Sequence, residues 1–219
     1  MSEAGAASGG TAANALARLP SGAFRRQDES PDTAFYRPPR LVTHIDDRAI
    51  AAVTELYREL FPPGGAILDL MSSWVSHLPP EIAYAEVVGH GMNAAELAAN
   101  PRLSRFFVQD LNRETSLPLP SAAFDGAGLC VSVQYLTDPV PVLREVARAL
   151  KPGAPVAITY SNRCFPTKAV AIWQALTPAD QARLVLLYLE AAGLGRSEVR
   201  ELLPPRGGDP LTAVIGWAA

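Results

Sequence analysis

The segment ILDLMSSWVSHLP, residues 67–79, has the pattern of a strand that delivers an acidic residue to a cofactor loop. Its apolar run reaches Asp69, and in nucleotide-cofactor domains the loop that follows is usually rich in glycine, because the backbone must approach the ligand closely. Here residues 70–79 contain no glycine. Three interpretations are open: a cofactor site built differently, a site that has been lost, or a segment that never formed one.

The elements that would position this loop are indicated by hydrophobic periodicity. Continuous apolar runs predict five strands of a buried parallel sheet, at 66–70, 83–89, 104–111, 124–133 and 154–161. Apolar residues at helical spacing predict helices at 46–61, 93–100, 138–152, 167–176 and 177–193. Two strands in succession, 196–203 and 210–218, end the chain. The alternation predicts an α/β fold with a doubly wound sheet and crossover helices.

Local signals support the helix starts in this pattern. Asn93 precedes a short helix and Glu96 follows three residues later, which is a capping-box pattern. Asp138 is a predicted cap before Pro139, a residue type favoured in the first helical turn.

Composition narrows the classes of protein to consider. The chain has 219 residues, 48% of them hydrophobic and 19% charged, with a net charge of −3. We therefore expect one globular domain over 32–219, with a lead-in and helix at 32–64 and a core at 65–219, after a mostly disordered tail at 1–31. The charge balance argues against nucleic acid as a partner, and no apolar run is long enough for a membrane helix. Two isolated cysteines give no zinc or disulfide pattern, so we expect no metal and a cytoplasmic location.

Residues 117–162 carry a more specific pattern. The pattern consists of short motifs and single residues in a fixed order along the chain. They are Leu117-Pro118, Phe124-Asp125, Asp138-Pro139, Leu143, Glu145, Arg148 and LKPG at 150–153. In this pattern the chain resembles the class I S-adenosylmethionine-dependent methyltransferases, in particular the type 11 methyltransferase domain. The resemblance implies a Rossmann-like, three-layer α/β/α fold whose seven-stranded sheet is mostly parallel with an antiparallel last strand. It also implies S-adenosylmethionine as the cofactor.

The same resemblance implies where the cofactor would bind. The family pattern after the first strand is D-x-G-x-G-x-G, so Asp69 keeps the acidic position while Met71, Ser73 and Val75 replace the glycines. After the second strand the family usually has an acidic residue that binds the ribose hydroxyls, and Gly91 stands there. After the third strand the acidic position facing the adenine amino group is kept. The implied cofactor residues are Asp69, Met71, Ser73, Gly91, Met92, Asp110 and Leu111.

In this family the ends of the fourth and fifth strands face the substrate. The resemblance therefore makes Gln134, Tyr135, Tyr160 and Arg163 candidates for substrate binding. Tyr135 and His77 are the candidate catalytic residues, and His44 in the lead-in is a further candidate base. Each has a structural alternative: Tyr135 could simply cover a strand end, and the histidines could be ordinary loop residues. Trp74 could stack on a flat ligand, but we expect it to pack against the sheet.

We therefore expect an S-adenosylmethionine-dependent methyltransferase that acts on a small molecule by direct methyl transfer. The altered loop leaves an alternative, a catalytically inactive protein of the same fold that binds the cofactor or another adenine nucleoside, or serves as an interaction module. An open pocket beside Met71 and Trp74 would favour binding, and a filled one would favour the interaction module. The sequence does not indicate the oligomeric state.

Overall fold

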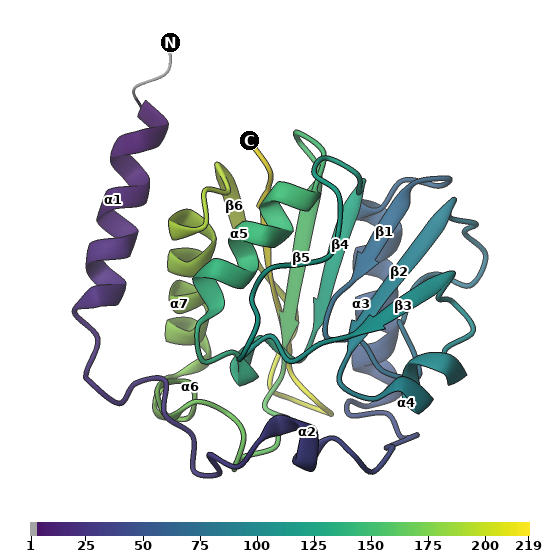
Figure 1. Cartoon of the computed structure of the whole chain (residues 1–219), viewed down its shortest axis with the longest axis horizontal. Helices are drawn as coiled ribbons and strands as arrows, with labels where there is room; N and C mark the ends of the chain where they lie inside the picture. Colours follow the sequence, from purple (N-terminus) through teal and green to yellow (C-terminus); the bar gives the residue numbers. More distant parts are fainter. Residues whose placement is uncertain (1–3) are drawn as a thin grey trace.

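The sheet is the centre of the fold. The computed structural model describes residues 4–219, with side chains from residue 10 onward. Seven strands pair in the order β3-β2-β1-β4-β5-β7-β6 (Figure 1). They are β1 Ala66–Asp69, β2 Glu86–Gly91, β3 Arg105–Val108, β4 Gly126–Cys130, β5 Pro155–Tyr160, β6 Arg196–Leu203 and β7 Leu211–Trp217. The first five are parallel, and β7 runs antiparallel to both β5 and β6.

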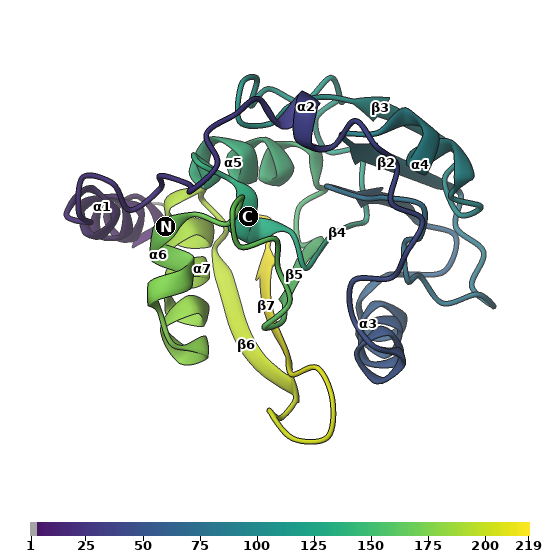
Figure 2. The ribbon, with the colours of Figure 1, turned by 90° about the horizontal axis from the view of Figure 1, so that it is seen from below.

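Helices cover both faces of this sheet. Figure 2 shows α3 (Asp47–Leu60) on one face, and α5 (Pro139–Ala149) and α7 (Pro178–Ala191) on the other. Shorter helices are α4 (Ala94–Ala99), α6 (Ala171–Ala175) and the 3-10 turn η1 (Val133–Tyr135). Strands β1, β4 and β5 are buried on both sides, as their continuous apolar sequences require. The predicted doubly wound sheet with an antiparallel last strand is confirmed.

The connection between β1 and β2 departs from the alternating pattern. Residues 70–85 form no helix, although a crossover between neighbouring parallel strands usually contains one. Pro79 and Pro80 lack the backbone N–H that a helix needs, and Met71 and His77 have positive φ angles of 56° and 52°. The segment therefore crosses as an irregular chain.

The N-terminal region differs from the predicted disorder. Helix α1 (Ala4–Ala17) contacts α7, and residues 18–31 continue along the domain. Leu16, Leu19 and Phe24 pack against the main core, and the Phe24 ring lies 6.2 Å from that of Tyr188. Small residues dominate the composition of this region, but these apolar side chains, together with backbone hydrogen bonds such as Ile172 N–H to the Ala23 carbonyl, attach it to the domain. Residues 1–3 of the predicted tail lie outside the described residues.

Residues 32–46, which we call the strap, pass beneath the carboxyl ends of the strands in Figure 1 and include α2 (Asp32–Phe35). Buried Asp32 fixes the start of the strap, because its carboxylate lies 2.8 Å from Arg26 Nη1 and 3.1 Å from Lys168 Nζ. The Asn112 amide also donates to Asp32, at 2.9 Å. Lys168 is fully buried. The strap is thereby attached to the loops that follow β3 and β5.

No helix among residues 4–219 combines the length and the apolar character that crossing a membrane requires.

Candidate functional site

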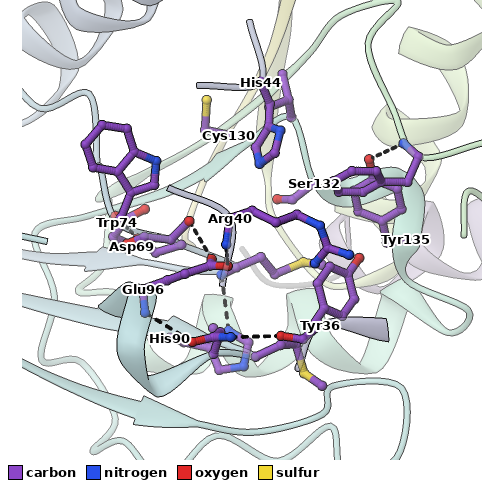
Figure 3. Close-up of a pocket in the computed structure, with 18 of the residues that line it drawn as sticks. Tyr36, Arg40, His44, Asp69, Trp74, His90, Glu96, Cys130, Ser132 and Tyr135 are labelled. Atoms are coloured by element: carbon purple, nitrogen blue, oxygen red, sulfur yellow. Dashed lines mark hydrogen bonds between the residues drawn. The ribbon is translucent and has the colours of Figure 1, made fainter. Parts of the chain in front are cut away.

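A cavity of about 280 Å³ lies between the strap and the carboxyl ends of β1, β2 and β4 (Figure 3). All seven predicted cofactor residues line it: Asp69, Met71, Ser73, Gly91, Met92, Asp110 and Leu111. Of the predicted substrate and catalytic residues, it includes Tyr135, Arg163 and His77, and also His44. Gln134 and Tyr160 do not line it. The Tyr160 hydroxyl instead donates to the Pro178 carbonyl at 2.9 Å, within the core.

Asp69 is the last residue of β1 and is 5% exposed. The Ser72 hydroxyl donates to its carboxylate at 2.5 Å. Burial raises the pKa of Asp69 to about 6, although the Ser72 and Ser76 hydroxyls act in the opposite direction. The cavity therefore contains a carboxyl group that titrates close to neutral pH.

Met71 keeps the backbone conformation that the missing glycine would favour. Its φ of 56° lies in the left-handed region, which residues other than glycine rarely adopt. The Met71 N–H donates to His90 Nδ1 at 3.1 Å, and the Ser72 N–H donates to the His90 carbonyl at 2.6 Å. Two hydrogen bonds to one residue thus hold the loop in a turn without glycine.

His90 is therefore a structural part of this loop. It lies on β2, is 1% exposed, and its Nε2 is 3.0 Å from the Gln109 carbonyl. Since Nδ1 accepts from Met71, Nε2 carries the proton and donates to Gln109. Burial lowers the pKa of His90 to about 4, so the imidazole is neutral at pH 7.

Gly91 occupies the position where the resemblance implied an acidic residue. A Cβ atom there would lie 2.5 Å from the Ser72 carbonyl oxygen. The loop after β1 therefore crosses so close to Gly91 that no side chain fits.

A different carboxylate enters the cavity from the next element. Glu96 of α4 accepts from the Ser73 hydroxyl and from the Arg40 N–H, both at 2.6 Å. Asn93 caps α4 as predicted, since its side chain accepts from the N–H groups of Ala95 and Glu96. Glu96 was predicted only as the second half of the capping box. Its carboxylate instead connects the loop after β1 to the strap, which sequence spacing alone could not indicate.

The loop after β3 presents Asp110 and Leu111 to the cavity. Asp110 Oδ1 accepts from the Asn112 N–H at 3.0 Å, which leaves its other carboxylate oxygen available. Leu111 is 4% exposed, yet its N–H has no hydrogen-bond partner within the described chain. A buried amide without a partner costs free energy unless a ligand accepts from it.

The opposite side of the cavity is formed by residues near the ends of β4 and β5. The Tyr135 hydroxyl accepts from the Phe165 N–H at 2.8 Å, and burial raises the pKa of Tyr135 to about 12. Arg163 is paired with Asp209 at 2.7 Å and its side chain is 63% exposed. Ser132 lines the cavity, and its buried hydroxyl has no hydrogen-bond partner among the described residues. Sequence reasoning missed Ser132, because a serine after a strand carries no distinctive signal.

Two further cavity residues can accept a proton. Burial lowers the pKa of His44, and it lowers that of His77 to about 4, so both imidazoles are neutral at pH 7. His44 comes from the strap, while His77 comes from the β1–β2 connection. Trp74 was expected to pack against the sheet. It instead lines the cavity, and its Nε1 donates to the Val42 carbonyl of the strap at 3.0 Å.

Comparison with known proteins agrees with this arrangement. Residues 72–158 match the model of a family described as "Methyltransferase domain". A structure of an S-adenosylmethionine-dependent methyltransferase from Aquifex aeolicus is similar with a TM-score of 0.56 and 17% identity, over 86% of this chain and 97% of that chain. A structure of an S-adenosylmethionine-dependent methyltransferase from Mesorhizobium loti has a TM-score of 0.55 and 18% identity, over 76% of this chain and 97% of that chain. No curated protein matches the sequence.

A protein described by a different activity has a similar fold. The [4+2]-cyclase SpnF is similar with a TM-score of 0.59 and 16% identity, over 85% of this chain and 90% of that one. At these identities the structural similarities show the fold alone. They show that the chain has the class I methyltransferase fold, and residues 72–158 within it match the methyltransferase-domain model.

Proposed function

We propose that this protein binds S-adenosylmethionine in the cavity and transfers its methyl group to a small molecule. The observation that carries the proposal is the unpartnered, buried Leu111 N–H beside Asp110. This pair offers one donor and one acceptor at the strand end where the family binds adenine. An adenine ring, with its ring nitrogen and amino group, would satisfy both.

The other ends of the cofactor have suitable partners in this chain. Glu96 would accept hydrogen bonds from the ribose hydroxyls, in place of the acidic residue that Gly91 excludes. Asp69, Ser72 and Ser73 surround the place of the methionine part. The open cavity beside Met71 and Trp74 favours binding over the role of an interaction module.

When bound, S-adenosylmethionine supplies a methyl group on a positively charged sulfur, and the protein chiefly has to orient a nucleophile in line with it. His44 and His77 are neutral at pH 7 and can accept a proton from a substrate hydroxyl or ammonium group. Tyr135 retains its own proton and can donate it in a hydrogen bond to the substrate, while its oxygen accepts from the Phe165 N–H. We therefore assign proton removal to the histidines and substrate orientation to Tyr135.

Calorimetric titration with S-adenosylmethionine and with S-adenosylhomocysteine tests the proposal. We expect micromolar binding, about −8 kcal/mol. Asp110→Ala should weaken it by about 1–3 kcal/mol, the scale of a lost charge-assisted hydrogen bond. Asp47→Ala, which removes an exposed carboxylate of α3 outside the cavity, is the matched control. Failure of the folded wild-type protein to bind either compound would contradict the proposal.

A further inference from the structure

The Arg40 side chain is held in a fixed position inside the cavity. Its guanidinium carbon lies 4.6 Å from the centre of the Phe35 ring, 5.3 Å from that of Phe165 and 5.8 Å from that of Tyr36. Nη2 donates to the Phe35 carbonyl at 2.9 Å. Such cation–π contacts orient an arginine without neutralising its charge.

No acidic side chain among the described residues forms an ion pair with the Arg40 guanidinium. The Glu96 carboxylate contacts Arg40 only through the backbone, because it accepts from the Arg40 N–H and from the Ser73 hydroxyl. Figure 3 shows the Arg40 side chain directed toward Tyr36 and Tyr135, away from Asp69. A guanidinium has five N–H donors, so several of those of Arg40 stay available to a ligand.

A second unsatisfied group lies in the same cavity. Ser132 is 6% exposed, and within residues 4–219 its buried hydroxyl has no hydrogen-bond partner. The preceding residue, Val131, has a φ of 45°, which is a strained conformation for a β-branched residue. Backbone strain immediately before an unpartnered hydroxyl indicates that the position of Ser132 serves a ligand.

We propose that Arg40 and Ser132 bind the anionic group of the methyl acceptor, a carboxylate or a phosphate carried by a flat apolar body. Arg40 is suited to a planar or tetrahedral oxyanion because its donors form a rigid fork. The rings of Tyr36, Trp74, Tyr135 and Phe165 line the remaining walls and suit the apolar body. This inference rests on the proposed function, since it assigns the acceptor for the same site.

The full-length protein can be titrated with benzoate, phenyl phosphate and the neutral benzamide by ligand-observed NMR, with and without saturating S-adenosylhomocysteine. We expect at least one of the two anions to bind about tenfold more tightly than benzamide, a difference of about 1.4 kcal/mol. Preference for benzoate identifies a carboxylate, and preference for phenyl phosphate identifies a phosphate. Equal binding of all three compounds would overturn the proposal.

Arg40→Gln should abolish the preference for anions, while Arg37→Gln, an exposed arginine of the strap outside the cavity, should preserve it. The affinity of Arg40→Gln for S-adenosylhomocysteine should stay within about twofold of wild type. If Arg40→Gln weakened the binding of S-adenosylhomocysteine as much as that of the anions, Arg40 would be assigned to the cofactor carboxylate and the substrate role would be overturned. Ser132→Ala should lower the affinity for the preferred anion. It should not lower the thermal stability of the protein, because it removes an unsatisfied group.

The two proposals fail separately. If S-adenosylhomocysteine does not bind the wild-type protein, the proposed function is wrong, and the titrations of the cofactor-free protein still decide whether Arg40 selects anions. If S-adenosylhomocysteine binds and the anions have no advantage over benzamide, only the acceptor assignment is wrong.

Discussion

At the scale of single residues, the loop after β1 keeps a left-handed turn without a glycine. Met71 has the left-handed backbone of the missing glycine, and His90 holds that turn through Met71 N–H. Glu96 brings a carboxylate to the cavity where Gly91 leaves no space for one. Because these changes are mutually dependent, restoring one family residue should harm the site.

Gly91→Asp tests this dependence directly. The new Cβ would lie 2.5 Å from the Ser72 carbonyl oxygen, which belongs to the backbone and cannot move alone. We expect a loss of about 1–3 kcal/mol in the free energy of unfolding, as for overpacked core sites. Urea denaturation measures this loss. Gly195→Ala, at a position with no atom near the added Cβ, is the control. Unchanged stability in Gly91→Asp would mean that the loop lies farther from β2.

His90 should make stability depend on pH. Its pKa is about 4 in the folded chain, against an ordinary 6.5. Between these values the unfolded chain binds a proton that the folded chain does not, so its contribution is complete above pH 6.5 and is lost as the pH falls toward 4. In urea denaturation, the stability advantage of wild type over His90→Gln should shrink by about 3 kcal/mol across this range. A constant difference would contradict the neutral, buried imidazole.

Asp69 should act with the opposite sign. Its pKa is raised from 3.8 to about 6, so the folded chain binds more protons than the unfolded chain between these values. The contribution of Asp69 to stability therefore rises as the pH falls from 6 toward 3.8. The same denaturation series with Asp69→Asn separates the two groups.

At the scale of elements, the strap closes the cavity and supplies Tyr36, Arg40 and His44 to it. Its start depends on Asp32, which is buried between two cations, Arg26 and Lys168. Removal of one cation leaves part of a buried charge unpaired. The position of the strap thus depends on a lysine more than 120 residues away in sequence.

Lys168→Met should release the strap. We expect a loss near 3 kcal/mol, the lower end of the range for breaking a buried ion pair, because Asp32 keeps Arg26. Hydrogen exchange should accelerate in residues 26–46 and remain slow in β1, β4 and β5. Lys151→Met is the control, since its pair with Asp125 is exposed and should contribute at most about 1 kcal/mol. Equal exchange of the strap in both variants would exclude this anchoring role.

At the scale of the whole molecule, one sheet with two covered faces predicts a single cooperative unfolding transition. The three tryptophans report on different parts: Trp74 on the cavity, Trp173 on the main core and Trp217 on β7. Fluorescence and far-UV circular dichroism should therefore give coincident transitions. S-adenosylhomocysteine at a hundred times its Kd should add about 2.7 kcal/mol to the free energy of unfolding. Separate transitions would instead mean that residues 32–219 do not unfold as the single domain that we predict.

The sequence by itself determined the sheet and most of its strands and helices, because these follow from apolar periodicity and from local signals such as Asn93, Pro139 and the LKPG turn. It also predicted the loops around the cavity, since the ends of parallel strands meet at one edge. Only the tertiary structure decided how the altered loop is held, through His90, and which carboxylate enters the cavity near Gly91. Glu96, Arg40 and Ser132 meet through contacts between segments distant in sequence, and no local pattern encodes such contacts.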